Sequence, residues 1–235
     1  MRNYLTFDGV DSRNFGLYIS GSGTFNSPER EYQNISIPGR DGDLLGVNTR
    51  LRNVGLSYPA FIYANARQQL AALRGFLLSH VGYFRLTDSY NTDEYRLAVY
   101  KGPLEADPTP VLDAVQFDLV FECKPQRYLI AGETAQSITS GDTLTNPSPF
   151  TARPLIRVHG AGSLTVGADV VTVAANNYSY IDIDAEMMDC YSGADNCNAL
   201  VTFAENDFPT LPAGQTGITY SGFSAVEVTP RWWRV

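Results

Sequence analysis

The sequence is poor in several residue types on which particular protein classes depend. Of its 235 residues, three are Cys, two are His, and only Lys101 and Lys124 are Lys. Three Cys in a chain of this length exclude a disulfide-rich scaffold. With 44% hydrophobic and 18% charged residues, the chain is neither disordered nor a coiled coil. No apolar run approaches the roughly 20 residues of a membrane-spanning helix, so we expect no membrane partner.

A signal peptide is also missing from the start of the sequence. Met1-Arg2-Asn3-Tyr4 leads directly into mixed polar and apolar residues, without an apolar core segment. We therefore expect synthesis in a reducing cytoplasm, where free thiols are the favoured state. Cys190 and Cys197 are seven positions apart, and the spacing alone is compatible with pairing or with a shared loop.

Negative charge is unevenly distributed along the chain. The net charge of −8 argues against tight nucleic-acid binding. Residues 1–130 contain 13 basic and 14 acidic residues, a net of −1, whereas residues 131–235 contain four basic and 11 acidic residues, a net of −7. Nearly all the cations are Arg, whose planar guanidinium favours fixed contacts with carboxylates. The two parts therefore look like different domains, the first suited to protein–protein contacts.

One segment predicts a helix, from Asn65 to about His80. Asn65 is a favourable N-cap, Gln68 completes a capping box, and Gly82 follows as a stop signal. The apolar residues that repeat at helical spacing and form one stripe are Ala66, Leu70, Leu73 and Leu77.

Most of the remaining sequence predicts strands. Residues 115–122 alternate between apolar and mostly polar side chains, and residues 51–60 form a further candidate. Residues 131–149 are mostly Ala, Gly, Thr, Ser and Pro, which indicates a linker or lead-in. After it, about seven short strands at roughly 8–12-residue spacing favour a β-sandwich over residues 150–235.

Motifs for catalysis or metal binding do not emerge from the sequence. The phosphate-binding, dinucleotide-binding and zinc-protease patterns and the nucleophile elbow do not occur. Asp41-Gly42-Asp43 resembles the start of a calcium loop, but Leu45 and Arg52 stand where further oxygen ligands are needed. The sequence therefore predicts no enzyme activity, no cofactor and no metal site, and the Asp-Gly-Asp segment is interpreted as a polar turn that leads into a hairpin.

Three carboxylates alternate with apolar residues in the C-terminal part. On a strand, Asp182, Asp184 and Glu186 project from one face, and Ile181 and Ile183 from the other. Such carboxylates bridge a metal in some proteins and act as acid and base in glycoside hydrolysis. A solvated strand face is the favoured interpretation.

Both tryptophans lie at the C-terminus. Trp232 and Trp233 occur in Pro-Arg-Trp-Trp-Arg-Val and are flanked by two arginines. An Arg–aromatic patch is a candidate contact for a glycan or a protein partner. A final strand whose rings seal the sandwich is the alternative, and it is favoured.

A series of short motifs in a fixed order gives the sequence its strongest resemblance. The motifs are Phe7-Asp8-Gly9-Val10-Asp11-Ser12, Ile37-Pro38-Gly39-Arg40-Asp41-Gly42, Gly82-Tyr83-Phe84-Arg85-Leu86-Thr87-Asp88-Ser89, Glu94-Tyr95-Arg96, Phe121-Glu122-Cys123-Lys124-Pro125-Gln126-Arg127-Tyr128-Leu129, Asn146-Pro147-Ser148, Ala152-Arg153-Pro154-Leu155-Ile156, the Phe208-Pro209 pair with Leu211 and Gly214, and the terminal Pro-Arg-Trp-Trp. Together they resemble the distal tail proteins (Dit family) of long-tailed, non-contractile bacteriophages, over nearly the whole chain.

The resemblance implies a mainly β fold with two domains. An N-terminal β domain (1–130) has one helix (about 65–80) and an extended belt hairpin (about 30–60). A linker or lead-in (131–149) then joins it to a C-terminal galectin-like β-sandwich (150–235). Sugar binding is not carried over from galectins, because this part has one His and four basic residues besides its Trp pair. Carbohydrate binding in host adsorption is kept as the alternative function.

The resemblance also implies a function. Family members form a homohexameric ring that caps the tail tube at the distal end of the virion tail and leaves a channel for DNA. They contact the tail tube protein and a tail-associated tip protein, and in some members receptor-binding or baseplate proteins. Closed rings require complementary patches on different surfaces of one subunit. The candidate subunit-interface residues are therefore the charged residues of the belt, namely Arg30, Arg40, Asp41, Asp43, Arg50 and Arg52.

Overall fold

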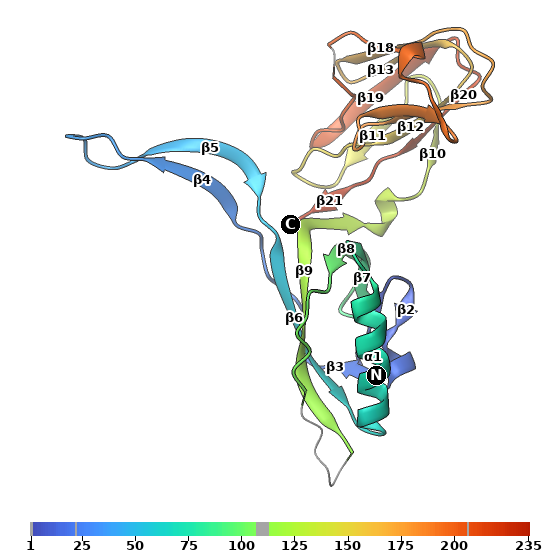
Figure 1. Ribbon diagram of the computed structural model, residues 1–235. Coiled ribbons are helices and arrows are strands. Elements are labelled where there is room, and N and C mark those ends of the chain that lie inside the picture. The colour runs from blue at the N-terminus through green and yellow to red at the C-terminus, as the bar shows by residue number, and fades with distance from the viewer. Residues whose placement is uncertain (1, 22, 107–112, 206) are drawn as a thin grey trace. The chain divides into compact units, whose positions relative to one another are not determined.

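The chain divides into two compact units, which are considered separately (Figure 1). The computed structural model describes residues 2–21, 23–106, 113–205 and 207–235, and side chains 47–49 lie outside that description. The N-terminal unit is Met1–Arg127 and the C-terminal unit is Tyr128–Arg234. The described residues contain many strands and one α-helix, so the mainly β fold with a single helix is confirmed.

A largely antiparallel sheet is the basis of the N-terminal unit, with the strand order β2-β1-β7-β8-β9-β6-β3. The strands are β1 (Leu5–Phe7), β2 (Val10–Asp11), β3 (Leu17–Ile19), β6 (Val54–Ile62), β7 (Phe84–Asp88), β8 (Asn91–Val99) and β9 (Val115–Leu129), and a 3₁₀ turn, η1 (Ser12–Phe15), follows β2. Alternate residues of β6 are buried. One face of the sheet therefore shares a core with the helix.

Helix α1 (Ala66–Ser79) buries the stripe that its spacing predicts, namely Ala66, Leu70, Leu73 and Leu77. Its capping differs from the expectation. Asn65 has a left-handed φ of 52° rather than the extended conformation of a capping residue, and its side chain makes no capping bond. Instead, the Ala66 N–H donates to Asp113 Oδ1 at 3.1 Å. Among the described residues, no helix is long and apolar enough to cross a membrane.

Strands β4 (Arg30–Ile35) and β5 (Leu44–Leu51) form a separate two-stranded hairpin. Figure 1 shows the hairpin projecting from the sheet of the N-terminal unit. A bond of 2.8 Å from the Arg52 N–H to the Glu29 carbonyl closes its base. The hairpin is shorter than the expected segment of residues 30–60, because the alternating burial of β6 begins at Val54 and places residues 54–62 in the main sheet.

The C-terminal unit consists of two sheets that share one core. The first has the order β10 (Gln136–Ile138), β20 (Ala225–Thr229), β12 (Leu155–His159), β15 (Ile181–Asp184), β16 (Asp189–Ser192) and β17 (Asp195–Asn196). The second has the order β11 (Thr143–Asn146), β19 (Gly214–Ser221), β13 (Gly162–Val166), β14 (Asp169–Val173) and β18 (Val201–Phe203). The unit also contains η2 (Ile130–Gly132), η3 (Asn198–Leu200) and β21 (Trp233–Arg234).

Residues 131–149 differ from the linker expected there. They contribute β10 and β11, one strand to each sheet of the sandwich. Ile138 and Leu144 from these strands are buried in the shared core. A single apolar anchor in each strand stabilises the segment, although its overall composition resembles that of a loop.

Candidate subunit interface

The hairpin β4–β5 carries exposed apolar side chains on both of its faces. Residues that pair across antiparallel strands share a face, and the pairs include Asn34 with Leu45 and Ile35 with Leu44. Leu44 and Leu45 therefore point to opposite faces, and they are 51% and 56% exposed. Tyr32, Ile35 and Ile37 are exposed as well.

Among the described residues, this apolar surface is not covered by the core of the N-terminal unit. None of the described residues of β4 or β5 belongs to the buried core. An isolated two-stranded hairpin is only marginally stable in water, and contiguous exposed apolar side chains mark sites of interaction. The described part of the hairpin therefore presents an apolar surface of the kind that marks sites of interaction.

The tip of the hairpin presents three charged side chains in close sequence. Arg40, Asp41 and Asp43 are all exposed, and within the described part of the chain none of them makes an ion pair. Gly39 and Gly42 have φ values of 82° and 79°, a left-handed conformation that glycine adopts at little cost, so the chain reverses sharply here. Across the described ranges, no group of three His, Cys, Asp or Glu residues is placed to hold a metal.

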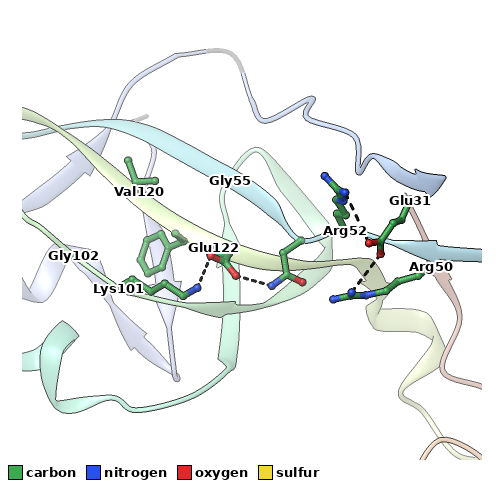
Figure 2. A pocket seen from close by; sticks show the side chains of 10 residues that line it. Glu31, Arg50, Arg52, Gly55, Lys101, Gly102, Val120 and Glu122 are labelled. Atoms are coloured by element: carbon green, nitrogen blue, oxygen red, sulfur yellow. Dashed lines mark hydrogen bonds and ion pairs between the residues drawn. The ribbon is translucent and has the colours of Figure 1, made fainter. Parts of the chain in front are cut away.

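A hollow of about 630 Å³ lies where the hairpin joins the sheet (Figure 2). Glu31 accepts from Arg50 at 3.3 Å and lies 3.8 Å from Arg52. Arg52 also lies 3.5 Å from Glu29. These pairs are exposed to water, so each contributes at most about 1 kcal/mol to stability. Arg50 and Arg52 therefore lie together at the base, while Arg30 is an exposed residue at the start of β4.

On the sheet side of this hollow, Glu122 is the centre of a small polar cluster (Figure 2). Its carboxylate accepts from Lys101 Nζ at 2.6 Å and from Asn53 Nδ2 at 2.7 Å. The hydrogen bond from Lys101, followed by that from Asn53, lowers the pKa of Glu122. Val120 lies on the same wall with its side chain 52% exposed. The hollow thus combines basic and acidic groups with an apolar surface, and such a mixture suits a protein partner.

The two C-terminal tryptophans have different environments. Trp232 is 5% exposed and packs in the sandwich core. Trp233 is half-buried, stacks on Phe150 with 4.5 Å between ring centroids, and donates from Nε1 to the Thr151 carbonyl at 3.0 Å. Trp232 therefore has the structural position that was favoured from the sequence, and a partner contact by Trp233 stays a prediction.

The expected solvated strand face is wrong for two of the three carboxylates, and the third, Glu186, lies in the turn after β15. Asp182 and Asp184 are 3% and 1% exposed. Arg157 on β12 binds Asp182 with two hydrogen bonds, at 2.7 and 2.8 Å. Arg231 from the C-terminal segment binds Asp184 in the same way, at 2.7 and 2.9 Å. These guanidinium groups supply the counter-charge that allows burial, and only Glu186 is exposed.

The pKa of Asp184 reflects a balance between burial and hydrogen bonding. Burial alone raises the pKa, but the hydrogen bonds from Arg231 and from the backbone N–H groups of Met187 and Glu186 outweigh it. The pKa of Asp184 is lowered as a result. Asp184 is therefore a structural anchor for the C-terminal segment, and no local pattern indicates this pairing because Arg231 is 47 positions away.

Comparison with known structures shows a match over the full length of the chain. Its structure is similar to that of the Dit protein (gp 19.1) of phage SPP1, described as a paradigm of the hub adsorption apparatus in phages that infect Gram-positive bacteria. The TM-score is 0.80 at 14% sequence identity, and the match covers 100% of both chains. The chain has the fold of a phage distal tail protein. The resemblance inferred from the ordered motifs is confirmed at the level of the fold.

A second similar structure comes from a baseplate. A chain from the phage p2 baseplate, in its activated conformation with Sr, matches with a TM-score of 0.54 at 10% identity. The match covers 97% of this chain and 96% of the p2 chain. No family model and no curated protein sequence matches this chain.

Proposed function

We propose that the chain is a structural component of a phage tail tip. In this proposal it forms a homohexameric ring adaptor that joins the tail tube to the baseplate or receptor-binding apparatus, with a central channel for DNA. The observation that carries the proposal is the full-length match to a phage hub protein, at a TM-score of 0.80. The uncovered apolar hairpin supports it, because a protein that acts alone does not need such a surface.

In the proposed ring, the hairpin of one copy lies against the next copy. Such a contact joins two different surfaces of the same chain, and it closes into a ring if the rotation between copies is right. Leu44 and Leu45, on opposite faces, would be buried by this contact. Arg40, Asp41 and Asp43 at the tip would find counter-charges on the neighbouring subunit, which gives the contact its register.

The remaining partners follow from the same proposal. The tail tube protein, the tail-associated tip protein and receptor-binding or baseplate proteins would contact the ring and the C-terminal unit, at the distal end of the virion tail. A net charge of −8 suits a channel wall past which DNA moves without being held, because tight DNA binding needs clustered cations.

Carbohydrate binding through the C-terminal unit was the alternative from the sequence, and no structural observation favours it. Trp232 is buried in the core, and one ring face of Trp233 is stacked on Phe150. We therefore propose only the structural role.

The decisive experiment removes the hairpin from the full chain. Residues 30–51 are replaced by a short Gly-Ser connection between Glu29 and Arg52, whose backbones are already hydrogen-bonded. We expect the parent protein to be a hexamer by sedimentation and a ring in negative-stain images, and the variant to be a folded monomer. If the variant is still a hexamer, the hairpin is not needed for assembly. If the parent is strictly monomeric at high concentration, the proposed hexameric ring is wrong.

A matched pair of point variants separates the hairpin from general surface effects. Leu45→Asp places a charge on the hairpin, and Val81→Asp does so at an apolar residue that is 91% exposed after α1. We expect only Leu45→Asp to shift the protein from hexamer toward monomer. Equal shifts for the two variants would contradict a specific hairpin contact.

A further inference from the structure

Two free cysteines of the C-terminal unit lie opposite each other, Cys190 on β16 and Cys197 directly after β17. Strands β16 and β17 pair in the register Tyr191 with Asn196 and Ser192 with Asp195. One further step along this register places Cys190 opposite Cys197. The Cys197 N–H donates to the Cys190 carbonyl at 2.7 Å, so the two backbones are adjacent at this step.

The two side chains also lie in the same core. Cys190 and Cys197 are 0% and 1% exposed, and both belong to the core cluster of the sandwich. The two residues share this one backbone bond, because the Cys190 N–H donates to Asn198 Oδ1 at 2.7 Å. Opposite residues of antiparallel strands have Cα atoms about 4.5–5.5 Å apart. Disulfides join residues whose Cα atoms are about 4.4–6.8 Å apart, so the backbone spacing of such a pair needs no large movement to accommodate one.

We propose that Cys190 and Cys197 are a modification site that forms a cross-strand disulfide on exposure to a disulfide oxidant such as glutathione disulfide. One thiolate of the pair attacks the oxidant and releases one glutathione thiolate, leaving a mixed disulfide. The second thiolate attacks the protein sulfur of that mixed disulfide and releases the other glutathione. The protein loses two protons and two electrons, and the oxidant is reduced to two glutathione molecules.

The environment of the pair sets when this reaction occurs. Burial raises the pKa of the Cys190 thiol to about 12, which makes its thiolate rare in the folded state. Oxidation is therefore slow in the folded protein and fast while the strands form or open. Cys123 does not compete, because it lies in the separate core of the N-terminal unit.

The consequence is a cross-link at one edge of the six-stranded sheet, where β17 is the last strand. In a reducing cytoplasm the pair stays a dithiol, and in an oxidising environment it closes when the strands open. This inference goes beyond the proposed function, since the chemistry is the same whether or not the chain forms a ring.

The test uses the full chain, unfolded and then refolded in a mixture of reduced and oxidised glutathione. Free thiols are alkylated with iodoacetamide, and the intact mass and the proteolytic peptides are measured. We expect the titratable thiols to fall from the three of the free state to one, with a linked peptide that contains Cys190 and Cys197. Three titratable thiols after refolding, or a linkage that includes Cys123, would overturn the proposal.

Two variants act as controls in the same experiment. Cys123→Ala keeps the pair, so we expect the same linked peptide and no free thiol. Cys197→Ser removes one partner, so we expect no intrachain link between residues 190 and 197. If Cys197→Ser fails to fold, peptide mapping of the parent and of Cys123→Ala still decides the matter, because neither lacks a member of the pair.

Discussion

The hairpins β13–β14 and β4–β5 differ in whether their apolar residues are buried. In β13–β14, Leu164, Val166, Val171 and Val173 are all at most 2% exposed, and they alternate with more exposed residues. In β4–β5, the apolar residues occur on both faces, and Leu44 and Leu45 are adjacent in the sequence and about half exposed. The first hairpin is part of a core, whereas the second buries none of its described residues in one.

The difference shows that the pattern of apolar residues along a strand indicates which surface covers them. Strict alternation fixes one face against the core of the same unit, and a slip by one residue would expose every buried side chain. When a hairpin has apolar residues on both faces, packing against one sheet buries only one of these faces. A hairpin of this second kind needs cover on two sides, which a neighbouring subunit can supply and its own unit does not.

The largest expected effect comes from placing the same charge in each hairpin. Leu164→Asp buries an unpaired carboxylate in the sandwich core, and we expect a loss of more than about 4 kcal/mol, so that the C-terminal unit does not fold. Leu45→Asp should change the stability of the monomer by less than about 0.5 kcal/mol. Denaturant unfolding followed by circular dichroism measures both. A strongly destabilised Leu45→Asp monomer would show that the hairpin is held by its own unit.

A smaller effect is expected where a buried ion pair of the sandwich is broken. Arg231→Met leaves the 1% exposed carboxylate of Asp184 without its guanidinium partner, and we expect a loss of about 3 kcal/mol. Exposed Arg153, which makes no ion pair with the described residues, provides the control, and Arg153→Met should cost less than about 0.5 kcal/mol. Similar losses in the two variants would argue against a specific role for the Asp184 pair.

The stability difference between the parent and Arg231→Met should depend on pH. The pKa of Asp184 is lowered in the folded state, so its carboxylate stabilises the fold fully above the ordinary value of 3.8. That contribution is lost as the pH falls below 3.8 through the lowered pKa. The difference in melting temperature between the parent and Arg231→Met should therefore shrink in acid. A difference that stays constant would point to lost packing rather than lost charge pairing.

The smallest effect on folding is expected at the base of the β4–β5 hairpin. The Arg50 side chain is 70% exposed and pairs with Glu31 at 3.3 Å, and surface pairs of this kind contribute about 0–1 kcal/mol. Arg50→Ala should thus barely change monomer stability, while it weakens the proposed ring and alters the salt dependence of assembly. Sedimentation at low and high salt measures this, and assembly identical to that of the parent would remove Arg50 from the interface.

Local periodicity explains which elements were predictable from the sequence. The stripe from Ala66 to Leu77 and the alternation within β9 each need only neighbouring residues, and both are confirmed. Residues 131–149 were misinterpreted because β10 and β11 are short, and only Ile138 and Leu144 anchor them in the core. Their Gly, Ser and Thr content resembles that of a loop, and no local property shows that two sheets are available to receive them.

Long-range pairing explains what could not be predicted. Asp182 is paired with Arg157 through the register of β12 and β15, and Asp184 is paired with Arg231 of the C-terminal segment. These pairings allow both carboxylates to be buried. The helix cap was missed for the same reason, since Asp113 is 47 positions from Ala66. For the belt residues from Arg30 to Arg52, both the polar turn at Asp41-Gly42-Asp43 and the resemblance predicted a hairpin, and their role as a subunit interface stays a proposal.

The boundary between the two units falls inside strand β9, and this has a practical consequence for dissecting the molecule. No loop separates Arg127 from Tyr128, so a truncation at this point cuts a strand rather than a tether. The Leu129 N–H donates to the Trp232 carbonyl at 2.8 Å, and a fragment that begins after Leu129 would lose this backbone bond to the C-terminal segment. Unit swaps between chains of this fold should therefore keep all of β9 in one piece and place the junction in a turn.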